Sequence, residues 1–288
     1  EAGPAATASG WPNLPPIPAE SGSSADEIVL HNEVVFGKGE IDNTELVFTR
    51  IGGRLKRASL MSGEHSDSRV QLVPETTTPD TESVYPFGLR FSNAALLDEL
   101  DRRRFEVEKS SETEVVFALT LPGAAVVRKR FAFSDKPHVV TATVEYTNLE
   151  PAPRVLGLDM EPAYTFTWGP NITSGDLLKG VQQALVWRTG AENGLLGTAS
   201  MKPDKGGQPY TRRFQGAEWL GVRSAYFVVA MRPGDTSGDG WALGDPNEFR
   251  FGYMVPKTEI APGQTVSNSF EVYIGPSHLP HLKRAWPT

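Results

Sequence analysis

Few residues of this chain combine the types and the spacing that catalysis or metal binding requires. His278 and His281 are three residues apart and could share a metal ion, but no third ligand is readable near them, so a solvated helix start is the preferred interpretation. Glu106 and Glu108 share one strand face, a spacing that could serve acid–base chemistry, yet solvent-facing alternation explains the pair without any function. Neither the nucleophile elbow G-x-S-x-G nor a phosphate-binding loop occurs. We therefore expect no catalytic, cofactor-binding or metal-binding residues, and no enzymatic activity.

Lys129 and the segment 234–240 resemble sites but are better explained as structural features. By alternation Lys129 shares a strand face with Val127 and Phe131. We expect its aliphatic stem to lie on apolar surface and its ammonium group to reach solvent at a sheet margin, rather than to form a buried ion pair. The segment 234–240 (GDTSGDG) has acidic residues and glycines like a calcium loop but lacks the distal glutamate, so a polar hairpin turn is predicted.

Composition argues against several classes of protein. The chain has 288 residues, of which 39% are hydrophobic, enough for a sizeable core and too many for a disordered protein. Its net charge of −7 argues against nucleic-acid binding, because a phosphate backbone requires a cationic surface. Basic clusters at residues 102–104, 128–130 and 283–284 are interpreted as solvated faces. Cysteine is absent, which fits an oxidising compartment but is also compatible with the cytoplasm.

Short apolar runs separated by turn residues recur over residues 27–276 and predict an all-β domain. Alternation is clearest over residues 139–146, where one face is polar and the other apolar, as in an antiparallel sheet with one solvated side. Residues 1–26 are rich in Pro, Ala, Gly and Ser and are predicted to be a flexible linker.

The segment from Phe214 to Pro233 is the most core-like part of the chain. It holds two apolar runs rich in β-branched and aromatic residues, and no serine, histidine or carboxylate cluster that would serve as a reagent lies within those runs. We expect a central strand pair here, with Phe227 buried against the opposing sheet.

Helical periodicity is scarce. Residues 93–100 could form two turns with Asn93 as the cap, and residues 277–288 are predicted to begin a C-terminal helix that leads toward a membrane. Apolar, aromatic and basic side chains together suit a segment that approaches a bilayer surface. Packing of the apolar residues back on the domain is the alternative. The candidates for contact with a membrane or a partner are Leu279, Leu282, Lys283, Arg284 and Trp286.

Four blocks of sequence, taken together, carry a family resemblance. They are residues 45–60 (ELVFTRIGGRLKRASL), 126–148 (VVRKRFAFSDKPHVVTATVEYTN), 219–233 (WLGVRSAYFVVAMRP) and 262–276 (PGQTVSNSFEVYIGP). In this order and spacing they resemble the large periplasmic domain of the YidC-type membrane protein insertases of Gram-negative bacteria. A lysine often follows the final Gly-Pro in that family, whereas Ser277 follows it here.

The resemblance implies a β-supersandwich, in which two large antiparallel sheets pack face to face as in galactose mutarotases, with a short C-terminal helix. It implies a non-catalytic domain without a cofactor, on the periplasmic side of the inner membrane, tethered by membrane segments that this sequence does not include. Such a domain would be a scaffold or docking surface of an insertase and chaperone for inner-membrane proteins. The implied partners are Sec translocon components, nascent membrane proteins and the membrane surface near the C-terminus.

The alternative is a carbohydrate-binding or aldose-epimerase-like protein of the same fold, because one fold can carry many functions. An epimerase needs a carboxylate base and histidine acids that converge on a sugar ring. The sequence neighbourhoods of His31, His65 and His138 show no such arrangement. A cleft that holds histidine and glutamate together would favour this alternative.

Overall fold

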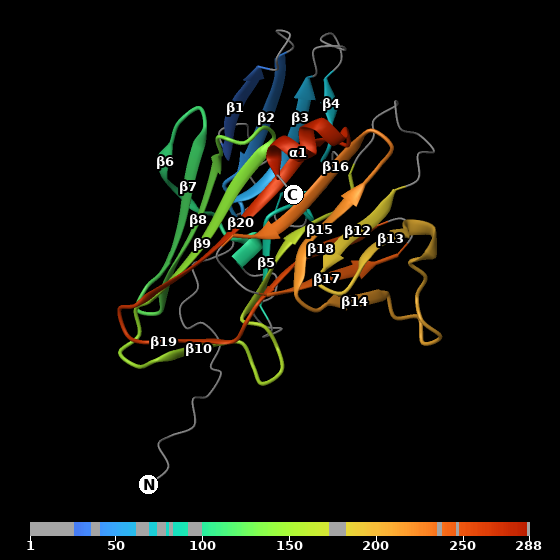
Figure 1. The fold of residues 1–288 in the computed structure, drawn as a ribbon. Coiled ribbons are helices and arrows are strands. Elements are labelled where there is room, and N and C mark those ends of the chain that lie inside the picture. Colours follow the sequence, from blue (N-terminus) through green and yellow to red (C-terminus); the bar gives the residue numbers. More distant parts are fainter. Residues whose placement is uncertain are drawn as a thin grey trace.

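Antiparallel strands make up most of the part of the chain that the computed structural model describes. That part comprises residues 26–35, 41–61, 69–73, 79–80, 83–91, 100–172, 183–234, 238–245 and 248–286. Three sheets form two layers packed face to face, with a short helix near the C-terminus (Figure 1). The predicted all-β supersandwich is therefore confirmed.

The larger layer is a nine-stranded antiparallel sheet, which spreads across the front of the molecule in Figure 1. The two runs of the Phe214–Pro233 segment are neighbouring interior strands of this sheet, and the alternating residues 139–146 lie in β9. In spatial order its strands are β13 (Asn193–Gly197), β12 (Ala184–Thr189), β15 (Ala217–Arg223), β16 (Phe227–Pro233), β20 (Thr265–Pro276), β9 (Val139–Asn148), β8 (Ala125–Phe133), β7 (Glu114–Leu121) and β6 (Glu106–Ser110).

The opposite layer consists of two smaller sheets. The four-stranded sheet contains β1 (Glu27–Val35), β2 (Ile41–Thr49), β3 (Arg54–Met61) and β4 (Val70–Gln71). The five-stranded sheet contains β14 (Tyr210–Phe214), β17 (Asp239–Gly244), β18 (Phe249–Val255), β11 (Tyr164–Trp168) and β5 (Gly88–Phe91). The remaining elements are the strand pair β10 (Arg154–Leu156) and β19 (Thr258–Ile260), the 3-10 helices η4 (Leu100–Arg102) and η6 (Thr198–Ser200), and the helix α1 (Leu279–Ala285).

Phenylalanine rings from all three sheets stack through the middle of the sandwich. The ring centroid of Phe48 in β2 lies 4.7 Å from that of Phe131 in β8, which lies 4.9 Å from that of Phe87, the residue before β5. Phe87 in turn stacks on Phe166 of β11 at 5.5 Å, and Phe166 stacks on Phe270 of β20 at 4.6 Å. All five rings are buried. Each such pair contributes about 0.5–1.5 kcal/mol beyond area burial, so the stack joins the two layers.

Two expectations about local structure are wrong. Phe227 packs against the core but is only half-buried, because it is the first residue of β16 and lies at the rim; Val229 and Met231 of the same strand fill the core instead. The segment 234–240 does not close a hairpin, because β16 belongs to the nine-stranded sheet and β17 to the five-stranded sheet. The chain crosses between the two layers at this point.

Two further expectations fall mostly outside the described residues. These are the linker, of which only Asp26 is described, and the two-turn helix over residues 93–100, of which only Leu100 is described, as the first residue of η4. Asp26 is buried and lies 2.5 Å from Arg104 Nη1 in an ion pair. The domain boundary near residue 26 and the linker remain predictions.

Candidate functional site at the C-terminal helix

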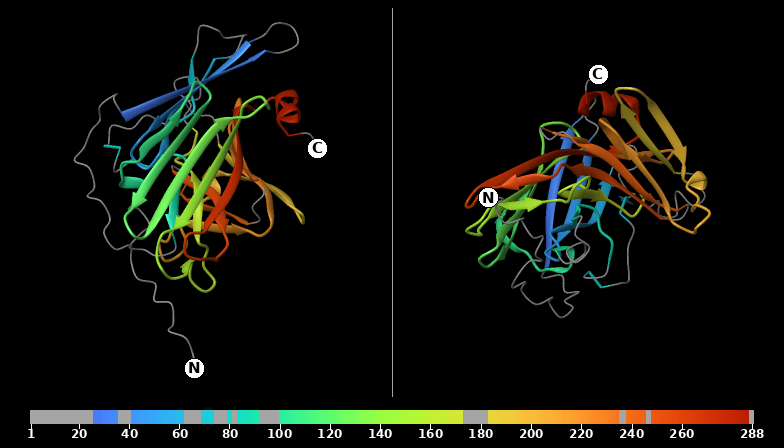
Figure 2. Two further views of the ribbon diagram at one scale, coloured as in Figure 1. Left: turned by 90° about the vertical axis from the view of Figure 1, so that its left-hand side faces the viewer. Right: turned by 90° about the horizontal axis from the view of Figure 1, so that it is seen from below.

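The helix α1 lies on the outer face of the nine-stranded sheet, away from the phenylalanine stack. Figure 2 shows it outside the sandwich, next to the last strands of that sheet. Its first turn contains Pro280, which tolerates this position because the amide hydrogens there have no partner within the helix. Lys283 and Arg284 occupy the last turn, where positive charge interacts favourably with the helix dipole.

A small apolar cluster on the outer face of the sheet holds α1 in place. It consists of the buried residues Val139, Val228, Ala230, Tyr273 and Ala285, with Leu282 and Trp286 packed against them. Residues next to these in the same strands point to the opposite side and belong to the main core. The strands are therefore apolar on both faces at this place. The uninterrupted run Val228–Met231 is the sequence signal for such double burial.

The structure divides the predicted helix stripe into two sets of residues. Leu282 is partly buried against the sheet, whereas Leu279 is 59% exposed. Trp286 is half-buried; its ring centroid lies 6.1 Å from that of Tyr273. Lys283 and Arg284 are exposed. Ala285, which was not among the candidates, lies on the side of α1 that faces the sheet and is fully buried.

Glu271 of β20 is the polar partner of the helix end. It accepts hydrogen bonds from Lys136 Nζ at 2.5 Å, from Arg232 Nε at 2.7 Å and from Trp286 Nε1 at 3.0 Å. The Arg232 guanidinium also lies over the Trp286 ring, 5.0 Å from its centroid. Burial raises the pKa of Glu271, but hydrogen bonds from Lys136 and Arg232 outweigh burial and hold the pKa below its ordinary value. Glu271 is therefore an anion that fixes the indole in one orientation.

The fold also brings together three residues with metal-ligand chemistry beside α1. His138 Nε2 lies 3.2 Å from Asp42 Oδ2 and 3.4 Å from His281 Nδ1, and the Asp42 oxygen lies 3.7 Å from the same His281 nitrogen. Burial and the neighbouring His138 lower the pKa of His281, and Asp42 opposes this shift. The sequence interpretation of His278 and His281 missed this cluster, because the other two residues come from distant segments; His278 itself is exposed.

Lys129 corrects an expectation, because it is fully buried instead of reaching solvent. Its ammonium group donates to the carbonyls of Gly52 at 2.7 Å and Phe87 at 2.9 Å and lies 3.5 Å from Asp101 Oδ1. Alternation correctly placed Lys129 on the inner face, but η4 and the Gly52 turn cover that face. The turn depends on glycine, since Gly52 has φ +73° and a Cβ there would lie 2.6 Å from the Asp101 carbonyl oxygen.

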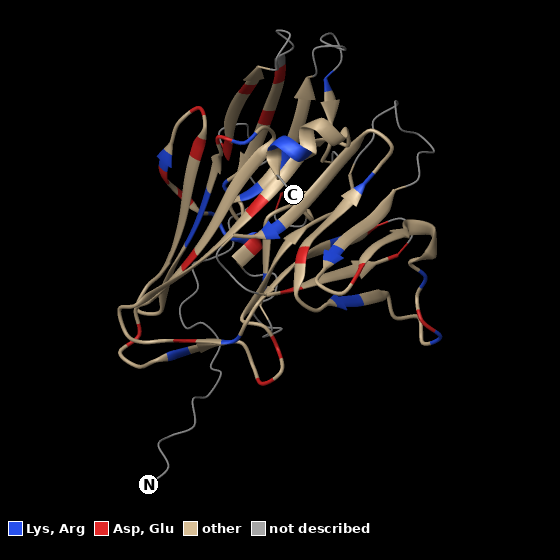
Figure 3. Cartoon of the chain, in the orientation of Figure 1, with Lys and Arg blue, Asp and Glu red and all other residues tan. Residues whose placement is uncertain are grey.

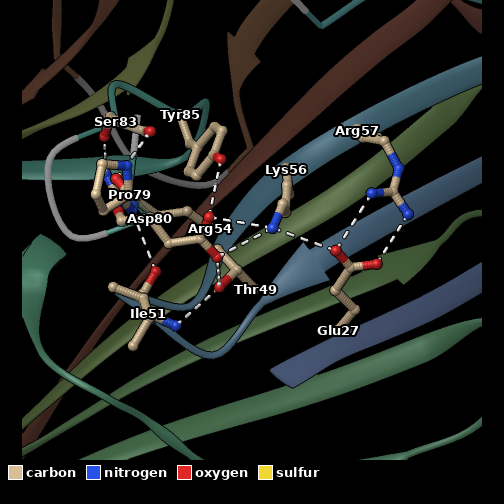
Figure 4. Close-up of polar contacts among 10 residues, drawn as sticks. All are labelled: Glu27, Thr49, Ile51, Arg54, Lys56, Arg57, Pro79, Asp80, Ser83 and Tyr85. Atoms are coloured by element: carbon tan, nitrogen blue, oxygen red, sulfur yellow. Dashed lines mark hydrogen bonds and ion pairs between the residues drawn. The ribbon is translucent and has the colours of Figure 1, made fainter. Parts of the chain in front are cut away.

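A buried polar network fastens the segment around Asp80 to the four-stranded sheet (Figure 4). The Asp80 carboxylate accepts hydrogen bonds from Thr49 Oγ1 at 2.8 Å and Tyr85 OH at 3.0 Å, and it lies 3.1 Å from Lys56 Nζ. Arg54 donates to three backbone carbonyls, those of Ile51, Asp80 and Ser83. A second carboxylate, Glu27, pairs with both Lys56 and Arg57. These charges find their partners within the protein, which is typical of a structural network.

A surface pocket on the four-stranded sheet places a histidine beside a glutamate. His31 Nδ1 lies 3.9 Å from Glu45 Oε2, and Arg69 Nη2 donates to the same oxygen at 2.8 Å. Asn43 also lines the pocket, whose volume is about 280 Å³. The carbohydrate alternative requires a histidine beside a carboxylate, but the Glu45 carboxylate already accepts a hydrogen bond from Arg69. His138, the other described histidine considered for this role, does not line the pocket. His65 is outside the described residues.

The two glutamates on one strand face and the two arginines of the 128–130 cluster are held in ion pairs. Glu106 pairs with Arg50, and Glu108 lies 2.8 Å from Arg128 Nε, so the two glutamates have separate cationic partners. Arg130 lies 2.5 Å from Glu114. Figure 3 shows acidic and basic residues interspersed over the strands. Such pairing is typical of solvated sheet faces and agrees with that interpretation for Arg128 and Arg130, whereas Lys129 between them is buried.

Comparison with known proteins identifies a matching family and several similar folds. The family model described as the YidC periplasmic domain matches residues 40–287, whereas no curated protein sequence matches the chain. A galactose mutarotase-like protein from Lactobacillus casei has a TM-score of 0.54 at 11% identity, covering 84% of this chain and 100% of that chain. A putative aldose 1-epimerase from Escherichia coli has a TM-score of 0.51 at 10% identity, covering 85% and 99%. At such identity the likeness concerns the fold alone.

No helix in the described part of the chain is long and apolar enough to cross a membrane.

Proposed function

The chain belongs to the YidC periplasmic domain family, and on that premise we propose that it is the non-catalytic domain of a membrane protein insertase. The family match over residues 40–287 carries the proposal. A periplasmic location follows from the family. We further propose that the domain is a scaffold or docking surface that assists insertion and folding of inner-membrane proteins, with Sec translocon components and nascent membrane proteins as its partners.

The outer surface of α1, formed by Leu279, Lys283 and Arg284, is the surface that we propose approaches the bilayer. Its three side chains are exposed, while Leu282 and Trp286 on the other side hold the helix on the sheet. One apolar and two cationic groups on a fixed helix suit contact with an anionic membrane surface. Because the helix is anchored by other residues, this surface can be changed without removing the anchor.

The experiment replaces this surface in the full-length protein. The variant Leu279→Asp/Lys283→Glu/Arg284→Glu should impair insertion of a model inner-membrane protein while the unfolding midpoint of the domain stays close to wild type. The matched control is Leu195→Asp/Lys202→Glu/Lys205→Glu. Leu195 is 61% exposed on β13, an edge strand of the nine-stranded sheet, and the two lysines, which follow that strand in the sequence, are exposed. Equal insertion by the two variants would contradict the role of the α1 surface.

The carbohydrate alternative is favoured by the pocket that holds His31 and Glu45, which lies open at the surface. An aldose mutarotation assay on the purified domain decides between the two functions. We expect no acceleration over the spontaneous rate, because Arg69 occupies the carboxylate that would act as base. Turnover above that rate that is lost in His31→Gln would establish the alternative instead.

A further inference from the structure

We propose that Asp42, His138 and His281 bind one zinc ion, which fastens α1 to the sandwich. The three residues come from separate elements: Asp42 from the start of β2, His138 from the turn before β9, and His281 from α1. Figure 1 shows the start of β2 and α1 at the same end of the molecule. The proposal is independent of the insertase function, and its test does not involve membrane insertion.

The three ligand atoms have the separations that a zinc site requires. Asp42 Oδ2, His138 Nε2 and His281 Nδ1 form a triangle with sides of 3.2, 3.4 and 3.7 Å. The centre of this triangle lies about 2.0 Å from each atom, which is the length of a zinc–nitrogen or zinc–oxygen bond. A proton can bridge only two of the three atoms, whereas one cation at the centre would bind all three.

The types of ligand favour a transition metal, and two histidines with one carboxylate are a ligand set that zinc uses. Two imidazole nitrogens and one carboxylate oxygen form a mixed set, whereas calcium and magnesium prefer oxygen ligands only. The carboxylate supplies one negative charge next to the ion. His138 and Asp42 are almost fully buried, while His281 is partly exposed at 20% of its side chain. The site therefore has two fixed ligands inside the protein and one on its solvent side, with an open position for water.

The backbone around His138 holds its ring in place before any ion binds. His138 has φ +60°, an uncommon conformation for a residue with a side chain, and its carbonyl accepts a hydrogen bond from Ile274 N at 2.9 Å. Gly275 allows this approach, because a Cβ there would lie 2.9 Å from His138 Cβ. The Tyr273 ring packs edge-on against His138 at 5.8 Å between centroids. Only His281 needs to move with α1, so the ion would couple the helix to the sheets.

The test is zinc titration of this chain, produced without a polyhistidine tag and first stripped with a chelator. Isothermal titration calorimetry should show one zinc per chain, and zinc should raise the unfolding midpoint of the stripped protein. Loss of even an outer-shell partner weakens metal sites about 10–100-fold, so His281→Asn and Asp42→Asn should each weaken binding by about 100-fold or more. Circular dichroism of each variant checks that it is folded.

The matched control is His278→Asn, on the same helix segment, whose exposed ring lies 5.5 Å from that of His281 but outside the triangle. It should bind zinc like the wild type. The proposal fails if the wild-type chain binds no zinc, whatever the variants do. It also fails if folded His281→Asn and Asp42→Asn bind as tightly as wild type, or if binding depends on His278 and not on Asp42. If a variant does not fold, visible absorption of the wild-type chain loaded with cobalt reports whether nitrogen and oxygen ligands surround the ion.

Discussion

Replacing Lys129 by methionine should remove a pH dependence from the stability of this domain. Lys129 is enclosed by the core, and its ammonium group donates to two backbone carbonyls and lies 3.5 Å from Asp101. Burial lowers the pKa of Lys129 from 10.5 to about 8; Asp101 opposes this shift, and Arg54 adds to it. Methionine keeps much of the length and volume of the side chain without the charge.

The sign and size of the effect follow from proton binding. Between pH 8 and pH 10.5 the folded chain has released the Lys129 proton while the unfolded chain still holds it. Because the unfolded state then binds more protons, the free energy of unfolding rises with pH through this window. One pKa unit corresponds to 1.36 kcal/mol, so the rise from pH 7 to pH 9.5 is about 2 kcal/mol. Burial raises the pKa of Tyr164, Tyr253 and Tyr273, and these raised values lower the free energy of unfolding as the pH rises further. The tyrosine contribution is the same in the wild type and in Lys129→Met.

The assay is urea unfolding of the wild type and of Lys129→Met at several pH values from 7 to 9.5. The quantity to compare is the difference between the two proteins, in which contributions from the tyrosines cancel. This difference should change by about 2 kcal/mol in favour of the wild type as the pH rises. An exposed control, Lys202→Met, should follow the wild type. Parallel curves for the wild type and Lys129→Met would refute a lowered pKa for the buried lysine.

Two further predictions concern the core and the helix end. Met231→Ala should lower the free energy of unfolding by about 2–5 kcal/mol, because Met231 is fully buried in the nine-stranded sheet. Phe227→Ala should lower it by less, because Phe227 lies at the rim. Urea unfolding of both variants measures the two losses, and a larger loss for Phe227→Ala would show that Phe227 and not Met231 is the core residue. Glu271→Gln should lower the free energy of unfolding at neutral pH by about 1–3 kcal/mol through weaker hydrogen bonds to Lys136 and Arg232. Because the folded pKa of Glu271 is lowered, the ionised carboxylate stabilises the folded domain fully above about pH 4.5, and this stabilisation disappears as the pH falls through the folded pKa. The free energy of unfolding of Glu271→Gln should therefore fall less steeply with acid than that of the wild type. Equal acid dependence of the two proteins would contradict this.

The sequence predicted those parts of the fold that depend on local pattern. Alternation over residues 139–146 identified β9, and the apolar runs after Phe214 identified the strand pair β15 and β16. The spacing of Leu279, Leu282 and Trp286 predicted α1, because helical periodicity needs only a few neighbouring residues. The family resemblance supplied the arrangement in two layers, which no local pattern contains.

The errors concern contacts between distant segments. Alternation gives the face of Lys129 but not the cover that η4 and the Gly52 turn place over it. The Asp42–His138–His281 cluster depends on the packing of α1 against β9, β16 and β20, which brings His281 to the start of β2; the spacing of His278 and His281 cannot reveal this. Leu282 and Trp286 pack on the sheet because its strands are apolar on both faces there, and the uninterrupted apolar run Val228–Met231 is the local sign of this double burial.

The position of β20 constrains the order in which this domain can assemble. It is the last strand along the chain, yet it lies in the middle of the nine-stranded sheet, between β16 and β9. Without β20 the other strands fall into two sets of four that are not paired with each other, and β16 and β9 would each present an open edge that invites pairing with other chains. These two edges stay open until β20 is available to pair. Its pairing with β9 joins residues far apart in the sequence, and such pairing is intrinsically slow. Aggregation of this domain should therefore be decided in the interval before β20 has paired, and α1, which packs across β9, β16 and β20, closes the assembly.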